Sequence, residues 1–306
     1  MKGLELSRAY FEEYGRELVE RFDPEGTTIS AGLSGYGSEC MGYDDEASRD
    51  HDFEPRFYLW IDDEADRAIG FKLMRAYNAL PREFMGFGRS KHSVYGAGRG
   101  GVVTVREFFE TFTGLDRPPE RGAEWLRIPE YALAAAVNGE IFVDNCREFA
   151  RCREILANGM PRDVRRKKLA ARLAIMAQSG QYNYPRILKR GDLGAAALAA
   201  AEYAAKGLET LFILNARYAP YYKWIFRAAR ELKILGGLAD DFEYILNAPQ
   251  GDEKVKRIEY TATEIIKELK RQDYSRSGDE YLEAHAVSVQ DAIRDRDLIG
   301  LHLMEG

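Results

Sequence analysis

The chain has 306 residues, of which 45% are hydrophobic, and this is enough to form one large domain or two ordinary ones. Its net charge of −6 is opposite to the basic balance of most nucleic-acid binders, so such a role is disfavoured. The three cysteines lack metal-ligand spacing and indicate reduced thiols. The N-terminus is charged, and no apolar run approaches the ~18 residues of a membrane span. We therefore expect a cytoplasmic protein with no membrane partner.

The first half of the chain mixes helix and strand patterns. An amphipathic helix is predicted over residues 4–22, and a short buried strand follows over 27–33. A glycine-rich turn and a polar loop then lead into an apolar run over 53–61, which predicts a second strand. The later predicted elements are helices over 62–78, 107–112, 129–139 and 145–156, a strand over 101–105, and an extended run over 140–143.

The pattern changes at residues 158–161, after which strand signals nearly vanish. Long helices are predicted over 161–179, 192–216, 219–235, 252–272 and 279–297. We therefore predict an α/β domain over residues 1–158 and an all-α helical domain over residues 159–306. The basic run over 162–172 is interpreted as a solvated helix face, with an RNA contact as the lesser alternative.

Two aspartates open the second predicted strand. Asp50 and Asp52 are two positions apart, so they share one face of a strand while His51 points to the other. Neighbouring carboxylates repel each other unless a cation lies between them, and Mg²⁺ or Mn²⁺ suits an all-oxygen site that also binds phosphates. The upstream turn offers backbone N–H groups and the hydroxyl of Ser38 to such phosphates. The pattern predicts a metal site at Asp50 and Asp52.

Other phosphate and metal motifs fit the glycine turn less well. A dinucleotide fingerprint requires G-x-G-x-x-G, but Gly35 and Gly37 are followed by Cys40. A Walker A loop requires Gly-Lys-Ser/Thr, which the turn lacks. A metal phosphohydrolase usually recruits several histidines. Besides His51 this chain has three histidines, and none of them lies close to another in the sequence.

The spacing of Gly37-Ser38 and Asp50-x-Asp52 resembles the signature of the nucleotidyltransferase superfamily, the polymerase-β-like fold. The strings GYGSE, SRDHDF, AQSGQYNYPR and LNARYAPYYKW are similar to an uncharacterised bacterial family within it, over about residues 27–235. The resemblance implies a nucleotidyltransferase-like α/β domain with a small mixed sheet, and Mg²⁺-dependent transfer of a nucleoside monophosphate from an NTP, with ATP favoured. Asp50 and Asp52 would be the catalytic metal ligands, and Gly37 and Ser38 would hold the β and γ phosphates. The acceptor hydroxyl is unknown, and a small molecule is favoured over a protein or an RNA end.

Cations in the helical half complete the expected nucleotide site. Lys223 and Arg227 are four positions apart and share one face of the predicted helix over 219–235. Two such cations would neutralise a triphosphate, so both are predicted to bind it. Lys206 and Arg217 are interpreted as ordinary solvated residues.

A third carboxylate, which members of the superfamily commonly carry on a neighbouring strand, is not evident in the sequence. The strand over 101–105 has no acid before Glu107, and Asp144 equally suits a helix cap. A noncatalytic nucleotide-binding or interaction module on the same fold is therefore the alternative function.

Overall fold

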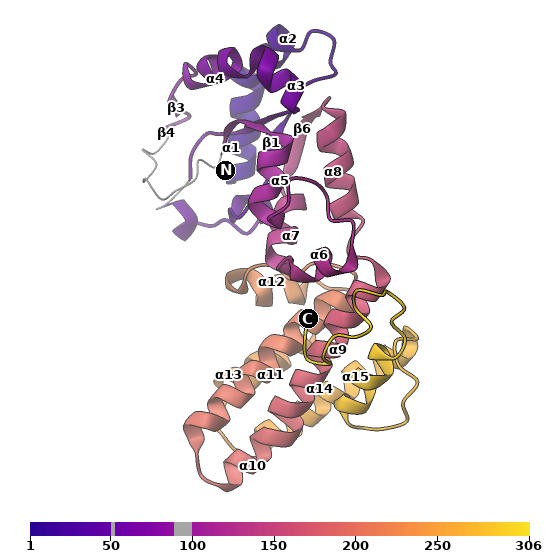
Figure 1. The fold of residues 1–306 in the computed structure, drawn as a ribbon. Coiled ribbons are helices and arrows are strands. Elements are labelled where there is room, and N and C mark those ends of the chain that lie inside the picture. Colours follow the sequence, from indigo (N-terminus) through magenta and orange to yellow (C-terminus); the bar gives the residue numbers. More distant parts are fainter. Residues whose placement is uncertain (50–52, 89–99) are drawn as a thin grey trace. The chain divides into compact units, whose positions relative to one another are not determined.

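The computed structural model describes residues 1–49, 53–88 and 100–306. The chain forms two compact units, which are described separately (Figure 1). Unit 1 comprises Met1–Pro118 and Ala132–Asn158, and unit 2 comprises Pro119–Tyr131 and Gly159–Gly306. Unit 1 has α/β architecture and unit 2 is helical, as the sequence predicts.

A four-stranded mixed sheet forms the centre of unit 1, in the order β5-β2-β1-β6. Its strands are β1 (Ser30–Leu33), β2 (Tyr58–Ile61), β5 (Gly101–Thr104) and β6 (Glu140–Asp144). Strand β1 runs antiparallel to β2 and β6, whereas β2 and β5 are parallel. The carboxyl end of β1 therefore lies beside the starts of the other three strands, and we name this end of the sheet the turn end. The predicted strands over 27–33 and 101–105 are confirmed, but the second strand begins at Tyr58 rather than at residue 53.

Alternation along the strands gives the sheet two apolar faces, each covered by helices. One face carries Leu59 and Ile61, which belong to a buried cluster with Phe11 and Leu73. The other face carries Trp60, which stacks on the ring of Phe149 at a centroid distance of 4.2 Å.

Unit 1 also has a short hairpin, formed by β3 (Glu83–Phe84) and β4 (Phe87–Gly88). Its helical segments are α1 (Gly3–Tyr10), η1 (Phe11–Gly15), α2 (Arg16–Phe22), η2 (Glu39–Met41), η3 (Ala47–Arg49), α3 (Asp63–Ala65), η4 (Asp66–Gly70), α4 (Phe71–Asn78), α5 (Val105–Thr113), α7 (Glu130–Val137, which begins in unit 2) and α8 (Arg147–Ala157).

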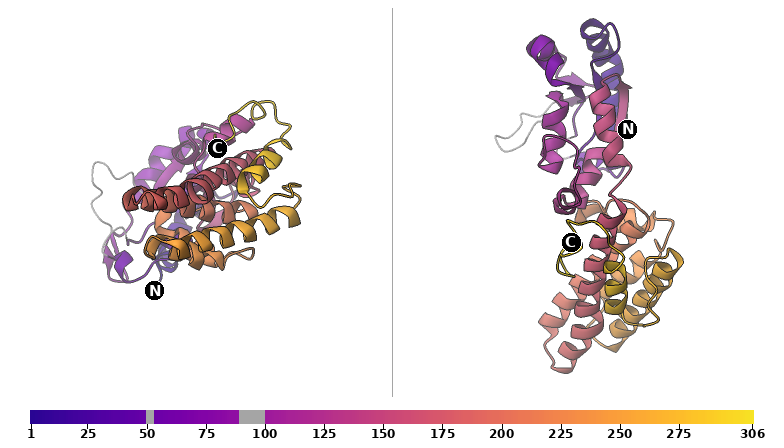
Figure 2. Two further views of the ribbon diagram at one scale, coloured as in Figure 1. Left: turned by 90° about the horizontal axis from the view of Figure 1, so that it is seen from below. Right: turned by 45° about the vertical axis from the view of Figure 1, so that its right-hand side comes forward.

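Unit 2 is a bundle in which α11 packs against α9 and α13 (Figure 2). The alanine-rich α11 permits close packing, because a Cβ on Gly207 would lie only 2.2 Å from the ring of Phe242. Tyr203 of the same helix is buried, and its hydroxyl donates to the carbonyl of Ile258 at 2.8 Å. The helical segments are α6 (Gly122–Arg127), α9 (Arg162–Met176), η5 (Ala177–Asn183), α10 (Tyr184–Lys189), α11 (Leu193–Leu214), η6 (Tyr222–Trp224), α12 (Ile225–Arg230), α13 (Leu238–Asn247), α14 (Asp252–Arg271) and α15 (Leu282–Gln290).

Two predicted helices of unit 2 are shorter than expected. The helix predicted over 219–235 consists of η6 and α12, and the chain turns after Arg230 with a left-handed backbone at Leu235. The helix predicted over 279–297 ends at Gln290, because the Asp163 carboxylate accepts hydrogen bonds from the N–H groups of Arg294 and Asp295. Within the described parts of the chain, no helix has both the length and the apolar character that crossing a membrane requires.

Candidate functional site

The glycine-rich turn leaves β1 at the turn end of the sheet and is fixed by Asn138. The side-chain amide of Asn138 donates to the carbonyl of Gly35 at 2.8 Å and accepts from the N–H of Gly35 at 2.9 Å. The hydroxyl of Ser34 donates to the carbonyl of Ala135 at 3.0 Å. Gly35 has φ of 137°, a conformation that favours glycine. Asn138 thus binds the two peptide units that flank the Cα atom of Gly35.

The next residues offer hydrogen-bond donors. Gly37 is buried and Ser38 is partly buried, and Ser38 precedes the 3₁₀ helix η2. A Cβ on Gly37 would lie 2.2 Å from a carboxylate oxygen of Glu39, so only glycine fits without displacing that side chain. Among the residues with described coordinates, none accepts a hydrogen bond from the Ser38 hydroxyl. The predicted phosphate-binding residues Gly37 and Ser38 therefore lie together in a turn with a donor to offer.

A buried ion network joins this turn to the segment that enters β2. Arg56 donates to Glu39 at 2.5 Å and to Glu54 at 2.9 Å. The Arg56 and Glu54 side chains are almost fully buried, and that of Glu39 is 12% exposed. Burial disfavours the charged guanidinium, but the two carboxylates outweigh it and raise the pKa of Arg56 above its ordinary value. The network is not evident in the sequence, because Glu39 and Arg56 are seventeen positions apart.

The two acids weighed as a third carboxylate lie at the other end of the sheet. Asp144 is paired in register with Ser30, whose hydroxyl donates to it at 3.2 Å. Glu107 caps α5 by accepting a hydrogen bond from the Thr104 hydroxyl at 2.8 Å. At the turn end, Glu140 is paired with Arg8. Asp144 and Glu107 therefore have structural partners away from the glycine turn.

The predicted metal ligands Asp50 and Asp52 lie outside the described residues, as does His51. Within the described parts of the chain, no group of three or more His, Cys, Asp or Glu side chains could hold a metal ion. The donors that suit Mg²⁺ are carboxylate oxygens, so the chemistry of the two aspartates fits this ion. Their assignment as metal ligands stays a prediction.

The predicted triphosphate ligands of the helical half are exposed residues of unit 2. Lys223 lies in η6, where its ammonium is 5.0 Å from the centre of the Trp224 ring. Arg227 lies in the following helix, α12. The two cations are thus on successive helical segments rather than on one long helix, and their phosphate-binding role stays a prediction. Arg217 is exposed, as expected.

The basic run over 162–172 is not simply a solvated helix face. Lys167, Lys168 and Arg172 are at least nine-tenths buried. Lys167 donates to the carbonyl of His302 at 2.7 Å and to the side chain of Gln290 at 3.0 Å. The interpretation of these three side chains as solvated is wrong, because tertiary partners from other segments of unit 2 surround them.

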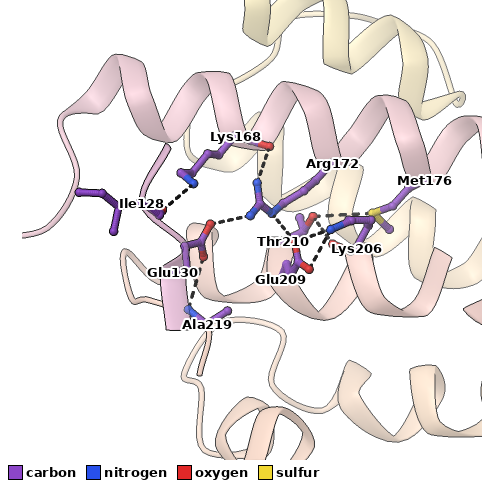
Figure 3. A network of polar contacts seen from close by, with 9 residues as sticks. All are labelled: Ile128, Glu130, Lys168, Arg172, Met176, Lys206, Glu209, Thr210 and Ala219. Carbon is purple, nitrogen blue, oxygen red and sulfur yellow. Dashed lines mark hydrogen bonds and ion pairs between the residues drawn. The ribbon is translucent and has the colours of Figure 1, made fainter. Parts of the chain in front are cut away.

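A cavity of about 630 Å³ lies within unit 2 beside Lys168 and Arg172. Arg172 forms ion pairs with Glu130 at 2.6 Å and with Glu209 at 2.9 Å, while Lys206 pairs with Glu209 at 2.9 Å (Figure 3). Lys206 is therefore not an ordinary solvated residue. The sequence gives little sign of this arrangement, because its charged residues come from three separate helices.

Lys168 is the least satisfied cation of this group. It is 4% exposed, and the one hydrogen bond that its ammonium donates to a described residue is long, at 3.4 Å to the carbonyl of Ile128. Burial lowers the pKa of Lys168 to about 8, while Glu130 opposes this effect. Figure 3 shows Lys168 directed toward Ile128.

Comparison with known proteins gives one similarity. A family model described as a domain of unknown function (DUF4037) matches residues 125–225. Neither the curated proteins nor the solved structures include a match to the chain. The matched residues contain every residue that lines the cavity of unit 2 except Phe226, Leu246 and Gly306, so the similarity to this family lies where the cavity is.

Proposed function

We propose that the protein is a Mg²⁺-dependent nucleotidyltransferase, which transfers a nucleoside monophosphate from an NTP to a hydroxyl of a small acceptor. The observation that carries the proposal is the ion network of Arg56. It joins the glycine turn, through Glu39, to the segment that begins directly after Asp52. Both halves of the motif are connected to the same end of the sheet, since the turn leaves β1 there and residues 53–57 enter β2 there.

The proposed chemistry assigns separate roles to the two parts of the motif. When bound, Mg²⁺ would supply positive charge to the phosphates and would be held by Asp50 and Asp52. The Gly37 amide and the Ser38 hydroxyl would hold the β and γ phosphates and orient the α-phosphate for attack by the acceptor. The buried ion network would keep the turn in place, so that few of its donors need to reorganise during the reaction.

A titration of the full-length protein with each of the four NTPs, with and without Mg²⁺, tests the proposal. We expect Mg²⁺-dependent binding of at least one NTP, with ATP favoured, and loss of that binding in the double variant Asp50→Asn, Asp52→Asn. The matched control is Asp116→Asn with Glu64→Gln, which removes the same charge from two exposed acids of unit 1. Undiminished Mg²⁺-dependent binding in the folded aspartate variant would overturn the metal assignment.

A noncatalytic nucleotide-binding module is the second candidate. The observation in its favour is that three described acids at the turn end, Glu39, Glu54 and Glu140, are ion-paired with arginines. Release of pyrophosphate from the bound NTP in the presence of a metabolite extract distinguishes the two functions. Mg²⁺-dependent binding without pyrophosphate release would favour the module, and absence of nucleotide binding would contradict both functions.

A further inference from the structure

The cavity of unit 2 has the size and the walls of a small-molecule site. Its volume of about 630 Å³ lies within the ~300–1,000 Å³ that such sites usually have. Its apolar lining includes Leu208, Ile225 and Phe226. Three tyrosines also line it, namely Tyr131, Tyr221 and Tyr222. Tyrosine commonly packs in the core, but these three are 41–74% exposed. Exposed aromatic rings of this kind can stack on a flat apolar ligand.

The charged groups of the cavity do not satisfy one another completely. Arg172 uses its guanidinium to bind Glu130 and Glu209, and Lys206 binds Glu209, so these four charges form a closed set. Lys168 forms no ion pair with any residue that the structure describes. An ammonium carries three N–H donors, and Lys168 directs one of them to a described acceptor, at 3.4 Å.

A buried cation with no counter-ion in direct contact is costly, because the lost hydration is not replaced; Glu130 attracts Lys168 without forming an ion pair with it. An anion that entered the cavity would supply the missing partner. The lining as a whole has the corresponding excess of positive charge. Among its side chains, Arg127, Lys168, Arg172 and Lys206 contribute four cationic groups, whereas Glu130 and Glu209 contribute two anionic ones; the backbone of Gly306, the last residue of the sequence, also lines the cavity.

We propose that the cavity of unit 2 binds a small organic anion with an apolar, aromatic body, whose carboxylate or phosphate pairs with the Lys168 ammonium. The tyrosines and Phe226 contact the body of the ligand, and Lys168 recognises its charge. The inference does not depend on nucleotidyl transfer, since all of its residues belong to unit 2.

Two probes that differ only in charge test the inference on the full-length protein. These are 2-naphthoate and its neutral isostere 2-naphthamide, with 2-naphthyl phosphate as a further arm that separates carboxylate from phosphate ligands. A charge-assisted hydrogen bond corresponds to a gain of about tenfold or more in affinity, so calorimetric titration should show naphthoate or the phosphate binding at least about tenfold more tightly than naphthamide.

The variant Lys168→Met should remove this preference, because methionine has a similar size but no charge. Lys254→Met is the matched control. Lys254 is also a buried lysine of unit 2 with no hydrogen-bond partner for its ammonium among the described residues, but it does not line the cavity. We expect Lys254→Met to retain the preference for the anion.

A titration against pH provides a measurement that requires no variant. The charged groups that face Lys168 are Glu130 of α7, Arg172 of α9, and Lys206 and Glu209 of α11. The anion requires the protonated ammonium, whose pKa in the free protein is about 8, so the preference for the anion should be full well below pH 8 and should decrease as the pH rises through this value. The inference is overturned if the charged probes bind no more tightly than naphthamide, if no probe binds at millimolar concentration, or if folded Lys168→Met keeps the preference.

Discussion

At the scale of the residue, Arg56 shows how a single side chain connects two segments of unit 1. It neutralises the carboxylates of Glu39 and Glu54, both of which have little contact with water. Removing one member of a buried ion network leaves the others charged and desolvated, which costs more than the attraction lost at a surface pair. The sequence signals none of this, because Arg56 has no periodic or motif context that distinguishes it from the other arginines of the chain.

We expect Arg56→Met to lower the free energy of unfolding by about 3–5 kcal/mol, because two buried carboxylates lose the guanidinium that neutralises them. Urea unfolding at pH 7 measures the change. The control is Arg121→Met, which removes a guanidinium that is 67% exposed and binds Asp297 at 2.9 Å. That substitution should cost much less, because an ion pair between exposed groups is screened by solvent. Equal stabilities of the two variants would show that the network contributes little.

Asp23 gives unit 1 a stability that depends on pH. Burial tends to raise the pKa of Asp23, but hydrogen bonds from the N–H groups of Ile29, Thr27 and Thr28 outweigh it and hold the pKa below its ordinary value of 3.8. A lowered pKa means that the carboxylate stabilises the fold above about pH 4, and that this contribution is lost as the pH falls through the folded-state pKa.

Asp23→Asn should therefore lower the free energy of unfolding by about 1–3 kcal/mol at pH 7, because its amide cannot accept all of these bonds on both atoms. The difference from the parent should shrink steadily below pH 4 in urea titrations. Asp116→Asn, at an exposed position, serves as the control. A difference that persists unchanged at pH 2 would contradict the proposed origin of the effect.

At the scale of the element, the shape of the glycine turn depends on the end of α7. The side-chain amide of Asn138 donates one hydrogen bond to the backbone of Gly35 and accepts another from it. These are the two bonds that a neighbouring strand would otherwise make. We expect Asn138→Ala to lower the free energy of unfolding by about 1–3 kcal/mol, because two backbone groups of Gly35 lose their partner.

Asn247→Ala on α13 is the matched control, since Asn247 is exposed and makes no side-chain bond to a described residue. Chemical denaturation compares the variants. Hydrogen exchange at residues 34–38 should also become faster in Asn138→Ala alone. Unchanged exchange there would show that the turn keeps its shape without the amide.

The elements that the sequence predicts best are those with a strong pattern of their own. The long α11 and α14 are regular, and their predicted ranges of 192–216 and 252–272 agree closely with Leu193–Leu214 and Asp252–Arg271. The predictions fail where contacts with a distant segment determine the local conformation or the burial of a side chain. The Asp163 carboxylate accepts backbone hydrogen bonds beyond α15, and the partners of Lys167 come from the C-terminal region. Charge alone could not distinguish such buried lysines from solvated ones.

The candidate sites show the same limit. Gly37 and Ser38 are predicted as phosphate ligands because a glycine-rich turn after a strand has a local signature; the structure has such a turn after β1, and their phosphate-binding role stays a prediction. The cavity of unit 2 has no such signature, because Glu130, Lys168 and Glu209 are far apart in the sequence and meet only after the helices pack. The glycine turn could therefore be predicted because its residues are neighbours in the sequence. The cavity could not, because its residues are neighbours only in the folded structure.

At the scale of the whole molecule, each unit has a hydrophobic core of its own. In unit 1, Phe149 stacks on Trp60, and in unit 2, Phe242 is fully buried against Gly207 of α11. Unit 2 also includes Pro119–Tyr131, so its core is assembled from two stretches of the chain. Separate cores allow the two units to respond separately to a loss of packing.

Calorimetry should therefore resolve two thermal transitions. Phe149→Ala should lower one of them and Phe242→Ala the other, because each removes an aromatic ring from one core at a cost of about 3–5 kcal/mol. The two proposed ligands extend the test, since Mg²⁺ with ATP should raise the transition that Phe149→Ala lowers, and the aromatic anion should raise the other. A single transition that every substitution and ligand shifts alike would contradict this expectation, because the two cores would then unfold as one cooperative unit.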